Sequence, residues 1–272
     1  IMSGSPIGIM DSGIGGLTVH SRIKALLPGE RLIYVADSAY CPYGPRPVEE
    51  IIQRCCLITR FFLSRDCKII VVACNTATAA AIDILRKSFP HTHVVGMEPA
   101  VKPAVLHTKS GVVGVLATRG TFKGSLYNRT LATFAGRVRV LEQVGEGWVE
   151  AVEKGEYDTL KTEEMVRKTI EPMLREGADH LVLGCTHYPF LVPVIRRVAG
   201  PGVEIVDPAP AVAQRVKHLL DEHLLAGTAG EKSGEDLYYT SSEETSVLPS
   251  AVPNAAKGGI IYWRPYTFEN ME

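Results

Sequence analysis

The chain has 272 residues, of which 46% are hydrophobic and 22% are charged, and its formal net charge at pH 7 is −1. This composition is that of a globular protein with a sizeable buried core, and it excludes disordered, collagen-like and coiled-coil proteins. A nearly balanced charge gives no overall attraction to nucleic acid or to an anionic membrane, so we expect neither as a partner.

Apolar segments alternate with amphipathic segments along the chain, which is typical of an α/β protein with largely parallel strands. Strands are predicted at residues 7–10, 32–36, 69–73, 94–96, 112–116, 138–141, 180–183 and 203–206. Helices are predicted at residues 17–27, 47–64, 76–88, 121–134, 162–176, 189–198 and 211–224. Pro172 lies inside the fifth of these helices, so we expect a kink or a restart there.

The chain carries a short internal repeat. Residues 7–11 (IGIMD) resemble residues 113–117 (VGVLA), and residues 70–76 (IVVACNT) resemble residues 180–186 (HLVLGCT) at a similar spacing. We therefore predict two similar lobes, each a mostly parallel sheet flanked by helices, with the active site in the cleft between them. The predicted boundaries are residues 1–98 plus 208–272 for lobe one and residues 99–207 for lobe two.

The amino-terminal residues lack a basic segment followed by an apolar one, so we expect no signal peptide and a cytoplasmic protein. The most apolar stretch, residues 69–85, is broken by polar side chains and is too short to span a bilayer. In a reducing cytoplasm the six cysteines are expected to be free thiols.

Two of the cysteines stand at matched positions of the repeat. Cys74 and Cys185 each follow a predicted strand and precede a predicted helix, at the sheet edge where α/β proteins bind ligands. The start of a helix favours a thiolate, so we expect both thiol pKa values to fall below about 8.5. We expect no chemistry from the other four: Cys55, Cys56 and Cys67 as packing residues, and Cys41 as a loop residue.

Two thiols that face each other from two lobes suit two-base proton transfer. One thiolate removes a proton from one face of a carbon atom, and the opposite thiol delivers a proton to the other face. Asp11 and His187 stand beside these thiols as assistants, and Asn75 or Thr76 and Thr186 are expected to cap the two helices.

Four motifs occur in order: Asp-Ser-Gly-Ile-Gly-Gly at residues 11–16, Pro-Tyr-Gly-Pro-Arg-Pro at 42–47, Ala-Cys-Asn-Thr-Ala at 73–77 and Gly-Cys-Thr-His-Tyr-Pro at 184–189. Over about residues 7–216 the chain resembles the glutamate racemases, the cofactor-independent branch of the aspartate/glutamate racemase superfamily. The resemblance implies a bacterial cytoplasmic enzyme, with no cofactor or metal, that interconverts L- and D-glutamate and supplies D-glutamate for peptidoglycan. We also expect a homodimer.

The resemblance also implies roles for single residues. Cys74 is similar to the thiol that acts on the D-enantiomer and Cys185 to the one that acts on the L-enantiomer, with Asp11 and His187 as supporting groups. Glu153 resembles a further acid of the site. The residues that match positions holding the substrate are Ser12, Pro42, Tyr43, Gly44, Asn75, Thr76, Thr118, Thr121 and Thr186.

The chain departs from the family pattern at several places. Cys41 stands where an aromatic or aliphatic residue is usual. Gly145-Glu146 stands where Cys-Pro is expected, so the path to Glu153 differs. The tail after about Tyr239, including residues 263–266, does not match, and we predict no role for it.

Other functions remain open at this point. The alternatives are an aspartate racemase, another cofactor-independent amino-acid racemase, or a two-lobed amino-acid-binding protein without chemistry. A zinc site of Cys74, Cys185 and His187 lacks a fourth ligand. A cysteine hydrolase built on Cys74 and His187 leaves Cys185 without a role, and a dinucleotide loop requires glycine where Thr18 stands.

Overall fold

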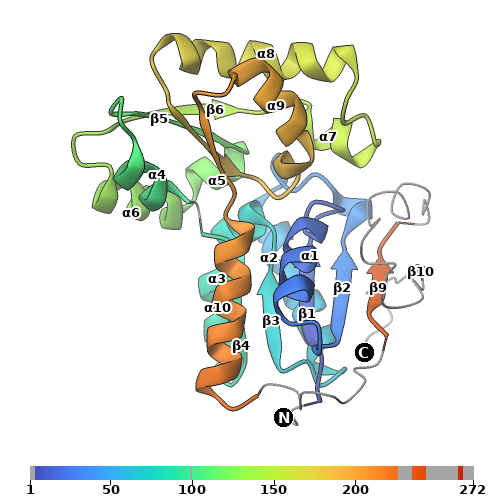
Figure 1. The fold of residues 1–272 in the computed structure, drawn as a ribbon. Helices are drawn as coiled ribbons and strands as arrows, with labels where there is room; N and C mark the ends of the chain where they lie inside the picture. Colours follow the sequence, from blue (N-terminus) through green and yellow to red (C-terminus); the bar gives the residue numbers. More distant parts are fainter. Residues whose placement is uncertain (1–3, 99, 226–234, 243–262, 266–272) are drawn as a thin grey trace.

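The computed structural model describes residues 4–98, 100–225, 235–242 and 263–265, and these residues form two parallel sheets (Figure 1). The first sheet has the strand order β10-β9-β2-β1-β3-β4 and the second has the order β6-β5-β7-β8. The strands of the first sheet are β1 (Ile7–Asp11), β2 (Leu32–Ala36), β3 (Ile69–Val72), β4 (His93–Gly96), β9 (Leu237–Thr240) and β10 (Trp263–Pro265). Those of the second are β5 (Val112–Ala117), β6 (Arg139–Val144), β7 (His180–Gly184) and β8 (Glu204–Val206).

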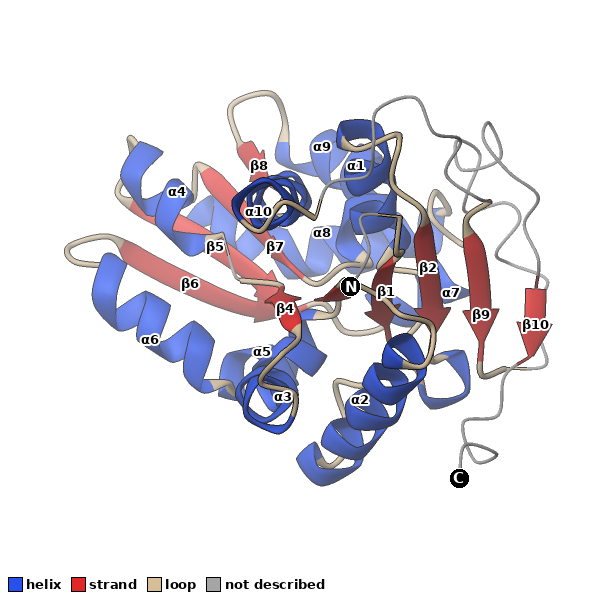
Figure 2. Ribbon diagram, turned by 90° about the horizontal axis from the view of Figure 1, so that it is seen from below, coloured by secondary structure: helices blue, strands red, loops and turns tan. Residues whose placement is uncertain are grey.

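Helices flank both faces of each sheet, as expected for parallel strands that are buried on both sides (Figure 2). Around the first sheet lie α1 (Leu17–Leu26), α2 (Val48–Leu63), α3 (Asn75–Ser88) and α10 (Ala209–Glu222). Around the second lie α4 (Val101–His107), α5 (Arg119–Lys123), α6 (Ser125–Phe134), α7 (Trp148–Glu153), α8 (Leu160–Arg175) and α9 (Val192–Ala199). Two short 3₁₀ turns, η1 (Ser38–Tyr40) and η2 (Tyr188–Leu191), complete the described elements. The predicted α/β architecture of two helix-flanked parallel sheets is therefore confirmed.

The two sheets repeat one topology. In the order β2-β1-β3-β4, strand β1 lies between β2 and β3, and in the order β6-β5-β7-β8, strand β5 lies between β6 and β7. The direction of winding therefore reverses at β1 in one sheet and at β5 in the other, and such a reversal opens a crevice at the carboxyl ends of the strands. The sequence repeat reflects this shared arrangement.

The hydrophobic cores follow from the alternation of side chains along each strand. In β1, Ile7 and Ile9 pack into the core beneath α1 and α10, whereas Met10 packs into a second core with Phe61 of α2. In the second sheet, Val113 and Val115 pack against α4 on the opposite face from α8. Both faces of each sheet are thereby buried.

Several elements differ from the prediction. The helix predicted at residues 121–134 is divided at Gly124 into α5 and α6, and α8 continues through Pro172, which lies in its last turn. Five elements were not predicted: η1, α4, α7, β9 and β10. Most of the tail after about Tyr239, residues 243–262 and 266–272, lies outside the described residues.

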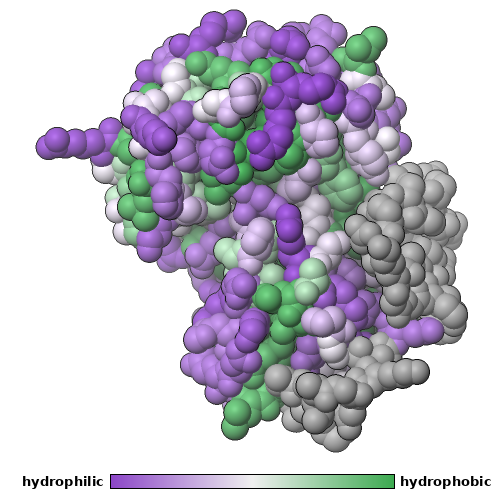
Figure 3. All heavy atoms as spheres, in the orientation of Figure 1, coloured by the Kyte–Doolittle hydropathy of each residue, from purple (hydrophilic) through white to green (hydrophobic). Residues whose placement is uncertain are grey.

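No helix among the described residues is both long enough and apolar enough to cross a membrane. In the face drawn in Figure 3, hydrophilic residues cover much of the upper and the lower part, and hydrophobic residues are interspersed among them.

Candidate active site

The first sheet with its helices, and the second sheet with its helices, are called the first and second halves of the molecule below. In the first half, Asp11 and Cys74 meet at one sheet edge. Strands β1 and β3 pair in parallel, so Asp11, the last residue of β1, and Cys74, which follows β3, reach the same edge. The Asp11 carboxylate accepts a hydrogen bond from the backbone N–H of Gly13 at 2.9 Å. Cys74 is the residue that caps α3, because its Sγ accepts the N–H of Ala77 at 3.4 Å. The cap expected from Asn75 or Thr76 is thus supplied by the thiol itself.

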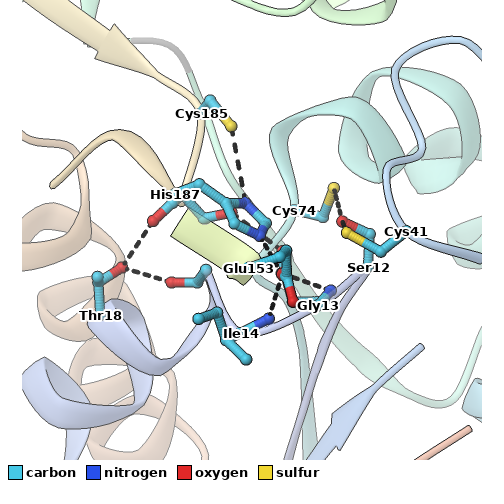
Figure 4. A network of polar contacts seen from close by, with 12 residues as sticks. Ser12, Gly13, Ile14, Thr18, Cys41, Cys74, Glu153, Cys185 and His187 are labelled. Carbon is cyan, nitrogen blue, oxygen red and sulfur yellow. Dashed lines mark hydrogen bonds and ion pairs between the residues drawn. The ribbon is translucent and has the colours of Figure 1, made fainter. Parts of the chain in front are cut away.

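In the second half, Cys185 and His187 occupy the corresponding edge. Both residues follow β7, and Cys185 Sγ lies 3.9 Å from Nδ1 of His187 (Figure 4). Thr118, which follows the neighbouring strand β5, caps α5 by accepting the N–H of Thr121. Thr186 does not cap a helix as expected. Its hydroxyl donates instead to the Asp11 carboxylate of the other half at 3.0 Å.

Further contacts join the two halves around the thiols. The backbone N–H of Ile14 donates to Glu153 Oε1 at 2.8 Å, and the hydroxyl oxygens of Thr76 and Thr118 lie 2.8 Å apart. A thiolate at Cys185 raises the pKa of Cys74, so the two sulfurs lie close enough for their charges to interact. The predicted site residues of both halves therefore gather in one place.

The thiol of Cys74 does not have the lowered pKa that its position at a helix start predicts. Burial raises the pKa of Cys74 well above its usual range, and the charge of Asp11 adds to this effect. The hydrogen bond from the N–H of Ala77 acts in the opposite direction but is outweighed. The pKa is raised instead of lowered because Cys74 is only 5% exposed and so loses the water that stabilises a thiolate.

His187 and Glu153 form an ion pair beside Cys185. Nε2 of His187 lies 2.5 Å from Oε1 of Glu153, which extends from the last residue of α7. Burial lowers the pKa of His187, but hydrogen bonds with Cys185, Cys41 and Glu153 outweigh it and raise that pKa well above its usual value. Burial raises the pKa of Glu153, yet the contact with His187 leaves it lowered overall. The pair is therefore an imidazolium and a carboxylate.

Asp11 is a buried carboxyl group whose pKa is raised. Burial is the main cause, and it exceeds the opposing charge of His187 and the hydrogen bonds from Gly13 and Thr186. Asp11 lies between the thiol of its own half and Thr186 of the other half, so it links the two parts of the site.

Asn75 is a buried amide whose polar atoms are not used within the described structure. Neither its Oδ1 nor its Nδ2 has a hydrogen-bond partner among the residues that the structure describes, although the side chain is 3% exposed. Buried amide atoms without partners are costly unless something binds them. Asn75 directly follows Cys74, so its free donor and acceptor are available to a molecule held beside that thiol.

The segment that follows β2 supplies the next part of the site. The hydroxyl of Tyr43 donates to Asp37 at 2.6 Å, so its proton is already used in this hydrogen bond. Tyr43 therefore helps to hold the segment in place. Pro42 and Gly44, with Thr118 of the other half, line a cavity of about 170 Å³ that also reaches Tyr188.

Cys41 belongs to the site, although the sequence suggested no role for it. Its Sγ lies 4.0 Å from the hydroxyl of Ser12, whose oxygen lies 3.9 Å from Sγ of Cys74. The side chain of Cys41 also contacts those of His187 and Glu153. A loop cysteine has no local signal of this kind, because its partners come from distant parts of the chain.

Tyr34 is a further residue that the sequence did not indicate. From the middle of β2 it donates a hydrogen bond of 2.6 Å to the backbone carbonyl of Gly13 and so fixes the turn that follows Asp11.

Comparison with known proteins places this arrangement in a family. Residues 7–216 match the family described as Asp/Glu/Hydantoin racemase. A glutamate racemase of Ectopseudomonas mendocina (strain ymp) is 45% identical over 92% of this chain and 94% of its own length. The structure of glutamate racemase from Francisella tularensis in complex with D-glutamate has a TM-score of 0.86 at 25% identity and covers 99% of this chain and 100% of that one. The Escherichia coli enzyme, solved with L-glutamate and the activator UDP-MurNAc-Ala, has a TM-score of 0.82 at 31% identity, with coverages of 95% and 97%.

Proposed function

Because this chain belongs to the Asp/Glu/hydantoin racemase family, and within it to the glutamate racemases, we propose that it interconverts L- and D-glutamate. The observation that carries the proposal is the pair of thiols, Cys74 and Cys185, which follow equivalent strands of the two sheets and interact with each other. Racemisation requires a base on one face of the α-carbon and an acid on the other, and this pair supplies both.

In the proposed reaction, Cys74 as thiolate takes the α-proton of D-glutamate while the thiol of Cys185 gives its proton to the opposite face. The product is L-glutamate, and the two sulfurs have exchanged protonation states. The reverse reaction starts with Cys185 as thiolate. The imidazolium of His187, 3.9 Å from Cys185, favours that thiolate and is held by Glu153, and Asp11 supports the side of Cys74.

The substrate is held by polar groups rather than by a buried cation. Its amino and carboxylate groups are assigned to three sets of partners. These are the free amide of Asn75, the backbone of Pro42, Tyr43 and Gly44, and the hydroxyls of Ser12, Thr76, Thr118, Thr121 and Thr186. Starts of helices suit a carboxylate because their N–H groups are not used within the helix.

The proposed lobes have the boundaries expected from the sequence, residues 1–98 plus 208–272 and residues 99–207. The carboxyl-terminal part of the first lobe includes segments outside the described residues. The chain would cross between the lobes twice, which permits them to hinge about the site.

In the cell, the proposed enzyme works in the cytoplasm as a homodimer and supplies D-glutamate for peptidoglycan. It uses neither a metal nor a cofactor, because the proton is moved by the two thiols alone.

The test is turnover in D₂O with purified protein and each glutamate enantiomer. A two-base enzyme labels the product much faster than the unreacted substrate, because the second thiol delivers a solvent-derived deuteron. Cys74→Ala and Cys185→Ala should each reduce turnover by at least the roughly 10²- to 10⁴-fold that general acid–base catalysis contributes. Cys56→Ala, at a half-buried thiol in the middle of α2, is the matched control.

Equal early labelling of substrate and product would refute the two-thiol mechanism. If the wild type and Cys74→Ala both bind glutamate and neither converts it, the result would favour the amino-acid-binding protein without chemistry. Faster turnover of aspartate than of glutamate would favour the aspartate racemase.

A further inference from the structure

Three chemically different side chains converge beside Cys185, and one of them, Cys41, has no role in the proposed reaction. A ligand atom from each of Cys41, Glu153 and His187 lies within 4.8 Å of both others. They come from three separate parts of the fold: the loop after η1, the end of α7 and the segment after β7. His187 is buried, and Cys41 and Glu153 are partly buried, so the cluster is not a surface group of acids.

A thiol, an imidazole and a carboxylate are the ligands that zinc prefers in proteins. With zinc bonds of about 2.0 to 2.3 Å, ligand atoms around a tetrahedral ion lie roughly 3.5 Å apart. The three ligand atoms lie within 4.8 Å of one another, so a zinc ion here requires changes of roughly 1 to 1.5 Å in their separations. The 2.5 Å contact between His187 and Glu153 must widen, whereas the sulfur must approach.

Gly13 leaves the space in which Cys41 and Glu153 meet. A Cβ at this position would lie 1.9 Å from Oε1 of Glu153 and 3.0 Å from Sγ of Cys41. Any other residue would push both side chains away, so glycine here allows the carboxylate and the thiol to approach each other against the backbone.

We propose that Cys41, Glu153 and His187 form a site for a zinc ion that inhibits the enzyme when it is filled. The ion takes the place between His187 and Glu153 that a proton now holds, and Cys41 releases its thiol proton to water as its sulfur binds the ion. It draws His187 away from the support of Cys185 and draws Glu153 from the N–H of Ile14, a bond of 2.8 Å between the two halves. The ion is an inhibitor and not a cofactor.

Binding is tested first, without reference to activity, by titrating the metal-free protein with Co²⁺. Coordination by a thiolate gives an intense near-ultraviolet charge-transfer band, and four-coordinate Co²⁺ gives strong visible bands. Both are expected in the wild type and in the control Cys56→Ser. Cys41→Ser should lose the charge-transfer band. It should also bind Co²⁺ more weakly, and the loss of affinity should exceed the about 10- to 100-fold that follows removal of a residue that only supports a ligand.

The competing sites are distinguished in the same way. Cys74→Ser and Cys185→Ser should retain the band. If either of them loses it while Cys41→Ser retains it, the metal lies between the two reactive thiols and the proposal is wrong. Absence of any sulfur-to-metal band in the wild type also overturns it.

The inhibitory effect rests on the proposed function and is measured separately, as the ratio of racemase activity with and without Zn²⁺ for each variant. Wild type and Cys56→Ser should be inhibited at Zn²⁺ concentrations that leave Cys41→Ser at its own metal-free rate, and EDTA should restore the activity. A protein with the Co²⁺ band but no racemase activity would refute the proposed function and not the metal site. Equal inhibition of wild type and Cys41→Ser would refute the inhibitory site.

Discussion

At the residue scale, the environment of Cys74 differs from that of Cys185. Cys74 receives a backbone N–H and lies near the carboxyl group of Asp11, whereas Cys185 lies beside the imidazole of His187. Burial and a neighbouring acid both oppose a thiolate at Cys74. In the proposed reaction we therefore expect the site to favour Cys74 as the proton donor, with the imidazolium of His187 next to Cys185.

The ion pair of His187 and Glu153 gives a prediction at this scale. Glu153→Gln removes the carboxylate that supports the imidazolium, so the pKa of His187 should fall and its charge should be lost at a lower pH. An NMR titration of the ¹⁵N-labelled imidazole measures this directly. Racemase activity at pH 8 should fall with the imidazolium population.

Glu150→Gln is the matched control, because Glu150 lies on the same helix, α7, with an exposed side chain. An unchanged titration of His187 in Glu153→Gln would show that the carboxylate does not hold the proton.

At the element scale, a buried network fixes the segment that follows β2. Arg54 of α2 binds both oxygens of Asp37 at 2.9 and 2.8 Å, and Asp37 also accepts the hydroxyl of Tyr43 at 2.6 Å. The guanidinium of Arg54 stacks over the ring of Tyr40 at 3.9 Å from its centre. The N–H of Asp37 donates to the carbonyl of Asp11, so the network joins the segment to the site.

Tyr43→Phe tests this network. The variant loses a hydrogen bond to a buried charge, so its free energy of unfolding should fall by about 1.5–3 kcal/mol in urea denaturation. The loosened segment should raise KM for glutamate more than it lowers kcat. Tyr40→Phe keeps the ring beneath Arg54 and serves as the control. A change in kcat alone would assign Tyr43 to the chemistry instead of to positioning.

The sequence predicted the elements that carry strong local patterns. Buried strands followed by Asp11, Cys74 and Cys185 were recognised because a short apolar run and the motif after it are adjacent in the chain. The meeting of Asp11 with Cys74 was predicted because parallel strands end at the same edge of a sheet. The meeting of Cys74 with Cys185 was predicted from the repeat, which indicates two lobes with the site between them.

Other elements depend on contacts that no local pattern shows. Strand β9 has four residues and forms by pairing with β2, which lies far away in the sequence. Helix α7 has six residues and begins after Gly147, whose φ of 78° belongs to the left-handed region. The raised pKa of Cys74 was missed because burial by distant segments outweighs the local effect of a helix start.

At the scale of the whole molecule, the fold buries a neutral histidine that makes its stability depend on pH. His20 of α1 is fully buried, and burial lowers its pKa to about 4 although Asp236 acts in the opposite direction. The hydroxyl oxygen of Tyr238 lies 3.1 Å from Nε2 of His20, within hydrogen-bond distance of the ring. Helix α1 and the β9 region are thus joined through a neutral imidazole.

The sign of the pH effect follows from linkage. Below pH 6.5 the unfolded chain binds a proton at His20, whereas the folded protein does not bind it until about pH 4. The free energy of unfolding should therefore fall by up to about 3 kcal/mol across this window. His20→Gln should show a smaller fall between pH 7 and pH 4 in urea denaturation.

His107→Gln, at the exposed end of α4, is the control for a histidine without this burial. Equal acid sensitivity of His20→Gln and the wild type would refute the role of His20.

The repeated strand order has a thermodynamic consequence. The two halves provide equivalent frames, but Cys185 lies beside the ion pair of His187 and Glu153, whereas Cys74 lies beside the carboxyl group of Asp11, a backbone N–H and a hydroxyl. Mirror-image amino acids have equal free energy in water, so the ratio kcat/KM of a racemase must be the same in both directions. The unequal surroundings of the two sulfurs can divide that ratio differently between kcat and KM, but they cannot favour one enantiomer at equilibrium. Net flow towards D-glutamate is set by whatever consumes it.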